Sequence, residues 1–176
     1  MDYSAKDSYT LAILVNNKAG VLMRVVSLFS RRGYNIDSLS VGETESPERS
    51  RITIVISGDR NIVDQIIRQA EKLVDVIKVY EMTTSGSVKA ELVLVKIKAD
   101  NSNRADIVTL GEIFKAKIID VTPETVSLQV VGNADKLESF LTLAEKYGIV
   151  ELVRTGMTAL ERGSRALAEI SFEEFV

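Results

Sequence analysis

Apolar residues in the first half of the chain recur with the period of a strand in some stretches and of a helix in others. Strands are expected over residues 9–15, 36–41, 52–57 and 74–80, and helices over residues 21–32 and 60–72. Gly33 follows the first helical stripe and is a good stop for it. The order strand–helix–strand–strand–helix–strand predicts a ferredoxin-like βαββαβ unit.

The same order of elements begins again in the second half. Strands are expected over residues 90–99, 117–121, 125–131 and 149–154, and helices over residues 103–114 and 134–147. Residues 51–59 and 125–133 share one alternating pattern and end in Gly-Asp and Gly-Asn respectively. Such a repeat of a whole unit predicts an α+β protein made of two tandem ferredoxin-like βαββαβ units.

A short polar stretch separates the two halves. Residues 83–87 read Thr-Thr-Ser-Gly-Ser, a composition typical of a linker. We therefore expect one domain over residues 1–84 and a second over residues 85–163. Residues 164–176 form a tail in which apolar and acidic residues are interspersed, and we expect it to be an amphipathic helix that docks on the body or on a partner.

The loop between the first strand and the first helix is the main candidate for a binding site. Residues 16–22 read Asn-Asn-Lys-Ala-Gly-Val-Leu, so a polar, glycine-containing loop leads into a helix N-terminus that favours an anion. Asn35, where the chain re-enters the sheet, can donate and accept hydrogen bonds. The pair suits a small zwitterion such as an amino acid, and the alternative is a plain strand-to-helix turn. The second half has residues 100–103, Asp-Asn-Ser-Asn, instead, so a ligand site is expected in the first half only.

The composition of the chain argues against catalysis and against nucleic-acid binding. The chain has neither His nor Cys, which removes the commonest general base, the commonest metal ligand and the thiol nucleophile. We therefore predict no catalytic and no metal-binding residues, although enzymes built on Asp, Glu, Lys or Ser remain open. The net charge of −3 gives little support for nucleic-acid binding. Without a long apolar run or a signal-peptide pattern, no membrane association is expected, and we expect a cytoplasmic protein.

The expected strands carry apolar residues on both faces, as Ile13 and Leu14 or Val93 and Leu94 illustrate. A ferredoxin-like unit covers one sheet face with its helices and leaves the other open. An open apolar face is unusual for a monomer, so the pattern predicts a homo-oligomer or an obligate complex. The alternative is that the two halves cover each other.

Several motifs in a fixed order resemble a known family. They are Asn17-x-x-Gly20-Val21-Leu22, the stretch 29–39 (Phe-Ser-Arg-Arg-Gly-Tyr-Asn-Ile-Asp-Ser-Leu), the stretch 118–123 (Ile-Ile-Asp-Val-Thr-Pro), and residues 153–163. Together they resemble the small regulatory subunit of acetolactate (acetohydroxyacid) synthase, whose first unit is an ACT domain. Lys18 stands where that family often has an acidic residue, and Met23 where it often has a smaller one.

The resemblance implies a non-catalytic subunit that binds and activates the thiamine-dependent large catalytic subunit of acetolactate synthase. It also implies feedback inhibition by a branched-chain amino acid, foremost valine, and a homodimer formed through ACT domains. Thiamine diphosphate, magnesium and FAD are expected only in the catalytic partner, and no cofactor in this chain. The implied effector-binding residues are Asn17, Ala19, Gly20, Val21, Leu22, Asn35 and Ile36.

Each of these residues has a chemical role in such a site. Backbone N–H groups of residues 19–22 would hold the carboxylate, and Gly20 would allow a close approach. Asn35, from the same or a neighbouring subunit, would hold the ammonium group. Two other classes of function stay open: a stand-alone amino-acid-sensing ACT protein that acts on another partner, and an independent enzyme on a ferredoxin-like fold.

Overall fold

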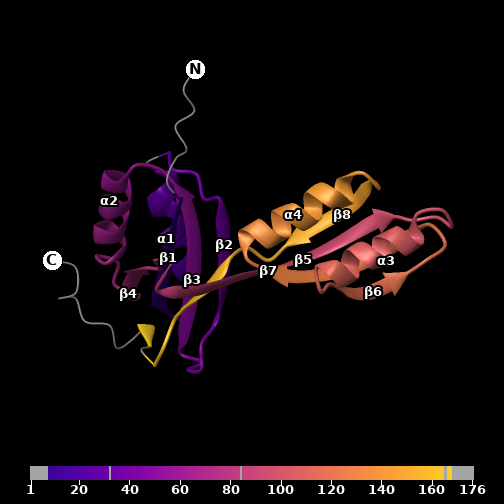
Figure 1. Cartoon of the computed structure of the whole chain (residues 1–176). Coiled ribbons are helices and arrows are strands. Elements are labelled where there is room, and N and C mark those ends of the chain that lie inside the picture. The colour runs from indigo at the N-terminus through magenta and orange to yellow at the C-terminus, as the bar shows by residue number, and fades with distance from the viewer. Residues whose placement is uncertain (1–7, 32, 84, 165, 168–176) are drawn as a thin grey trace, which may run out of the picture. The chain divides into compact units, whose positions relative to one another are not determined.

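The structure is a computed structural model that describes residues 8–31, 33–83, 85–164 and 166–167. It divides into two compact units (Figure 1). The first combines the chain up to residue 88 with the chain from residue 157 onward, and the second comprises residues 89–156. Residues 157–163, which the sequence places with the second half, thus group with the first unit.

The first unit is built on a four-stranded antiparallel sheet with the strand order β2-β3-β1-β4. This order, with two helical crossovers, is the βαββαβ arrangement expected from the hydrophobic pattern. Its elements are β1 (Ser8–Asn16), α1 (Val21–Ser30), β2 (Ser38–Glu43), β3 (Arg49–Ser57), α2 (Arg60–Ala70) and β4 (Val76–Glu81).

One face of this sheet packs against both helices to form the core of the first unit. Alternate residues of β1, namely Leu11, Ile13 and Val15, are buried there with Phe29 of α1 and Ile66 of α2. Because side chains alternate along a strand, Ala12 and Leu14 of β1 point to the opposite face of the sheet. That opposite face carries its own apolar residues and must be covered separately.

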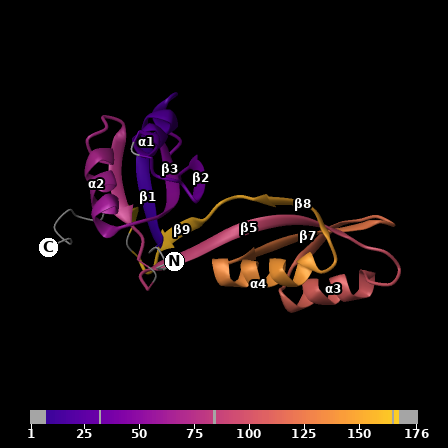
Figure 2. The ribbon, with the colours of Figure 1, turned by 90° about the horizontal axis from the view of Figure 1, so that it is seen from above.

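The second unit repeats the arrangement with the strand order β6-β7-β5-β8. Figure 2 shows α3 and α4 together on one side of this sheet. Its core contains Phe140, which packs edge-to-face on Phe114 with ring centroids 5.5 Å apart. The elements are β5 (Ser87–Lys98), α3 (Arg104–Ile113), β6 (Lys117–Val121), β7 (Thr125–Gly132), α4 (Ala134–Glu145) and β8 (Ile149–Arg154).

Local details confirm the internal repeat. Asp59 Oδ1 accepts a hydrogen bond from the Asn61 N–H at 2.7 Å and caps α2, and Asn133 Oδ1 accepts one from the Lys136 N–H at 3.0 Å and caps α4. The pairing of β1 with β4 shifts register within β1, and the pairing of β5 with β8 shifts register within β5. The aligned Gly-Asp and Gly-Asn of the sequence therefore have the same structural role.

A segment near the end of the chain, which we call the return segment (residues 157–164 and 166–167), covers the second face of the first sheet. It contains a strand that the sequence pattern did not predict, β9 (Thr158–Glu161), which pairs with β5. Ala159 and Leu167 are buried in one cluster with three residues of the first sheet and its border, Ala12, Leu14 and Met82.

Hydrogen bonds fix the return segment to the sheet. The Met157 N–H donates to Ser38 Oγ at 2.7 Å, and Ser40 Oγ donates to the Met157 carbonyl at 2.9 Å. Arg51 Nη2 donates to the Ala159 carbonyl at 2.6 Å. The segment is therefore an integral layer of the first unit.

These contacts change the argument for a homo-oligomer. In the first unit the chain itself covers much of the apolar face that was expected to need a partner. In the second unit the comparable face keeps Leu94, Ile119, Val131 and Val153 between 37% and 52% exposed, so the argument for a homo-oligomer holds there.

The helix expected over residues 164–176 falls largely on residues 165 and 168–176, which lie outside the described residues. Within the described residues, none of the helices has the length and apolar character needed to cross a membrane.

Candidate functional site

The loop from β1 to α1 places Gly20 at the N-cap position of the helix. Gly20 has φ 82° and ψ −5°, a left-handed conformation that glycine adopts at little cost. No side chain of the described residues caps the helix, and its first turn contains no acidic residue. A Cβ added to Gly20 would meet no atom within 4 Å, so the space beside the helix N-terminus is open.

Three backbone N–H groups at the entrance to α1 are available as hydrogen-bond donors. The N–H groups of Asn17 and Lys18 donate within the chain, to the carbonyls of Glu48 at 2.7 Å and Asn16 at 2.9 Å. By contrast, none of the described residues accepts a hydrogen bond from the N–H of Ala19, Gly20 or Leu22. These unpaired donors lie at the positive end of the helix dipole, where an anion is stabilised.

The side chain of Asn17 fastens the loop to the β2–β3 hairpin. Asn17 Nδ2 donates to Glu43 Oε1 at 3.1 Å and to the Pro47 carbonyl at 2.9 Å. Both partners lie more than twenty positions away in the sequence, so local pattern reasoning could not find them. In this structure the amide of Asn17 thus holds the loop in shape.

Asp75, just before β4, organises the charge beside the loop. Its carboxylate pairs with Arg24 Nη2 at 2.9 Å and lies 3.8 Å from Lys18 Nζ. The Asp75 carbonyl also accepts from the Asn16 N–H at 2.9 Å. A hollow of about 180 Å³ lies between the first turn of α1 and residues 72–76, next to these charges. From the sequence, Asp75 is expected to be an outward-facing strand position and not a site residue, because no local pattern relates it to α1. In the structure its side chain is instead 12% exposed and paired with Arg24.

The other residues implied by the resemblance occupy different environments. Val21 is 3% exposed and belongs to the core of the first unit, whereas Leu22 is at the surface. Ile36 also packs against that core. Asn35 is exposed, its Nδ2 donates to Asp37 Oδ1 at 3.0 Å, and no hydrogen bond joins it to the loop in the described part of this single chain. The structure therefore brings together residues 17–22 but does not add Asn35 to them.

The corresponding loop of the second unit contains a carboxylate of its own. Asp100 Oδ1 accepts hydrogen bonds from the N–H and the Oγ of Ser102, at 2.7 and 2.6 Å, and from the Asn103 N–H at 3.2 Å. These hydrogen bonds, foremost those from Ser102, lower the pKa of Asp100 below its ordinary value. The entrance to α3 thus accommodates a carboxylate from within the chain, whereas no described side chain accepts a hydrogen bond from the backbone N–H groups at the entrance to α1.

The arrangement is suited to binding an anionic group through backbone N–H donors. The described residues contain no cluster of three or more acidic side chains with the geometry of a metal site. The residues around the α1 loop include amides, two cations and two carboxylates. Both cations are paired with the Asp75 carboxylate, and the Glu43 carboxylate accepts a hydrogen bond from Asn17. This chemistry supports recognition of a ligand.

Comparisons with known proteins agree along almost the whole chain. Residues 90–163 match a family model described as the small subunit of acetolactate synthase, and residues 11–78 match one described as an AHAS small subunit-like ACT domain. A probable acetolactate synthase small subunit of Archaeoglobus fulgidus is 48% identical over 157 residues, which are 89% of this chain and 98% of that protein. The acetolactate synthase isozyme 3 small subunit of Salmonella typhimurium is 44% identical and covers 89% of this chain and 97% of that protein.

A solved structure gives the same result. The crystal structure of the acetolactate synthase small subunit from Thermotoga maritima superposes with a TM-score of 0.83 at 38% sequence identity. The match covers 90% of this chain and 99% of that chain.

Proposed function

Because this chain belongs to the acetolactate synthase small subunit family, we propose that it activates the catalytic large subunit of that enzyme and makes it sensitive to feedback inhibition by a branched-chain amino acid, foremost valine. The effector site in this proposal is the β1–α1 loop. In this proposal thiamine diphosphate, magnesium and FAD belong to the catalytic partner, and this chain holds no cofactor.

One observation carries the assignment of the effector site. The N–H groups of Ala19, Gly20 and Leu22 have no acceptor among the described residues, and they surround an uncapped helix N-terminus. At the repeated position in the second unit, the Asp100 carboxylate accepts from two backbone N–H groups. A free amino acid would supply to the first unit the carboxylate that the second unit supplies to itself.

The rest of the effector would use groups from elsewhere. The aliphatic side chain would contact the exposed apolar surface beside the loop, which includes Leu22 and Val74. The ammonium group needs an acceptor, and the side-chain oxygen of Asn35 from a neighbouring subunit suits it, since Asn35 lies outside the loop of its own chain. Two copies joined through their ACT domains would then complete the site, and effector binding would favour one quaternary arrangement over another.

Reconstitution with the catalytic subunit tests the proposed function. Addition of this chain to the large subunit is expected to raise the rate of acetolactate formation, and valine is expected to lower that rate only when this chain is present. Size-exclusion chromatography of the mixture should give one complex. If the two chains do not associate while this chain alone binds valine, the result favours a stand-alone amino-acid sensor.

Asp75→Asn is expected to increase the affinity for valine severalfold. The substitution removes a negative charge beside the proposed carboxylate site and leaves Arg24 and Lys18 without their carboxylate partner. The free energy of unfolding should fall by about 1 kcal/mol or less, because the cations of these pairs are largely exposed. Calorimetric titration with valine and a denaturant melt measure the two effects.

Asp64→Asn is the matched control, since it breaks a surface pair with Arg60 at 3.0 Å on helix α2. It should leave the valine affinity unchanged. Equal affinity in the Asp75→Asn variant and in the wild type would argue against a carboxylate at the α1 loop.

A further inference from the structure

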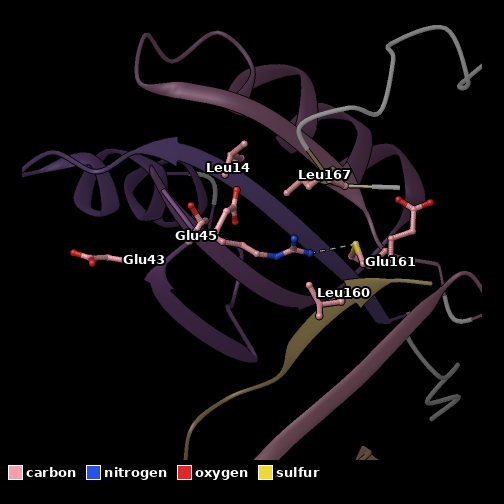
Figure 3. Close-up of a pocket in the computed structure, with 10 residues that line it drawn as sticks. Leu14, Glu43, Glu45, Leu160, Glu161 and Leu167 are labelled. Carbon is pink, nitrogen blue, oxygen red and sulfur yellow. Dashed lines mark hydrogen bonds between the residues drawn. The ribbon is translucent and has the colours of Figure 1, made fainter. Parts of the chain in front are cut away.

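A second hollow lies on the other face of the first sheet, under the return segment (Figure 3). Its volume is about 490 Å³, within the range of small-molecule sites. Figure 3 shows Leu14 from the sheet and Leu160 and Leu167 from the return segment around it. Met82 adds a thioether to this apolar lining, and Arg51 and Glu45 add charge.

Arg51 brings a positively charged guanidinium to the lining of this hollow. Its Nη2 already donates to the Ala159 carbonyl at 2.6 Å and lies 3.9 Å from Met82 Sδ. Its Nε is buried and has no hydrogen-bond partner among the described residues. Burial lowers the pKa of the Arg51 guanidinium from its ordinary value, and the Glu45 carboxylate acts in the opposite direction. A buried donor without an acceptor is unfavourable. The Arg51 side chain also lines the hollow, so a ligand carboxylate there would pair with the charge of its guanidinium.

Carboxylates at the edge of the hollow restrict the charge of the ligand. Glu45 is exposed, and its side chain accepts no hydrogen bond from another of the described residues. Glu43 and Glu161 also line the hollow, so a ligand with only negative charge would be repelled. A ligand with only positive charge would pair with the carboxylates but would offer no acceptor to the Arg51 guanidinium. A zwitterion satisfies both signs, with its carboxylate on Arg51 and its ammonium group on Glu45.

The apolar lining selects the remainder of the ligand. Leu14, Leu160 and Leu167 surround a space that a branched aliphatic side chain would fill, and the burial of its methyl groups would contribute to affinity. We propose that this hollow binds an α-amino acid with a large aliphatic side chain, at a site separate from the β1–α1 loop. It extends the proposed function by a second ligand on the same unit.

The β2–β3 hairpin links the two sites. Glu43 accepts the hydrogen bond from Asn17 of the loop, and Glu43 and Glu45 both line the hollow. A ligand that repositions this hairpin from one side changes the free energy of binding on the other, and such coupling is reciprocal. Occupation of the hollow is therefore expected to change the affinity of the loop for valine.

Methionine methyl groups report on each site separately. The sequence contains four methionines; Met82 lines the hollow, and Met23 lies exposed on α1 next to the loop. The full chain is labelled with ¹³C at the methionine methyls and titrated with leucine. The final leucine concentration is about ten times an expected dissociation constant of about 1 mM. The titration is repeated with three variants, Gly20→Asp, Leu160→Trp and Ile113→Trp.

Leu160→Trp fills the hollow from an exposed position, and Ile113→Trp adds the same side chain to an exposed position of α3. We expect leucine to shift the Met82 methyl signal in the wild type, in Gly20→Asp and in Ile113→Trp, and Leu160→Trp to weaken this response at least tenfold.

If leucine does not shift the Met82 methyl signal in the Gly20→Asp variant, the proposal of a second site is wrong. This result leaves the proposed function untouched. The reverse pattern, a Met82 response without any Met23 response in the wild type, supports the hollow and counts against the loop. A Met82 response of equal strength in Leu160→Trp also overturns the proposal, because it places the leucine elsewhere.

Discussion

Replacement of Gly20 by Asp is expected to abolish inhibition of the holoenzyme by valine and to leave activation of the large subunit intact. The new carboxylate would lie at the uncapped N-terminus of α1 and take the N–H groups proposed for the effector. Loss of two or three charge-assisted hydrogen bonds, together with charge repulsion, should weaken valine binding by at least about 100-fold. Acetolactate formation measured against valine concentration, with and without the chain, gives both quantities.

The backbone supplies the control for this substitution. Gly20 and Gly33 both have positive φ, 82° and 68°, and in both cases a Cβ would meet nothing within 4 Å. Gly33→Asp therefore introduces the same charge and a similar conformational cost of about 1–2 kcal/mol near the opposite end of α1. It should retain valine inhibition. If Gly20→Asp retains it as well, the effector binds somewhere other than this loop.

Phe140→Ala is expected to lower the stability of the second unit by about 3–5 kcal/mol, the largest change in stability that we predict. Phe140 is fully buried, and its replacement removes both its core contacts and the edge-to-face packing on Phe114. The first unit has a separate core, so its stability should change little. Differential scanning calorimetry should then resolve a low-temperature transition that is absent from the wild type.

Leu143→Ala, on the same helix but 46% exposed, is the matched control and should cost less than about 1 kcal/mol. Valine binding should survive in Phe140→Ala below the new transition, because the loop belongs to the first unit. Loss of valine binding in step with unfolding of the second unit would contradict this separation.

Periodicity was sufficient to predict most of the fold. All eight strands and four helices of the two βαββαβ units lie where the apolar pattern placed them, with ends shifted by a few residues. The Gly-Asp and Gly-Asn pairs matched in the sequence proved to be matching helix caps, at Asp59 and Asn133. Local patterns were enough here because each element buries one face, and burial sets the period.

The return segment was not predictable in this way. β9 has four residues and pairs with a strand about seventy positions earlier, so neither its length nor its composition distinguishes it from a loop. The hydrogen bonds from the Asn17 side chain to Glu43 and Pro47 could not be predicted for the same reason. The sequence located the candidate loop at residues 16–22, but the contacts that shape it depend on long-range pairing.

The path of the chain through the first unit has a consequence for its synthesis. The second unit is inserted between residues 88 and 157, so a ribosome makes all of it before the residues that cover Ala12 and Leu14. Until Ala159 and Leu167 emerge, the nascent first sheet presents an apolar surface open to chaperones or to premature association. A chain truncated before residue 157 should therefore still fold the six elements of its first unit, β1 to β4 with α1 and α2, and yet aggregate.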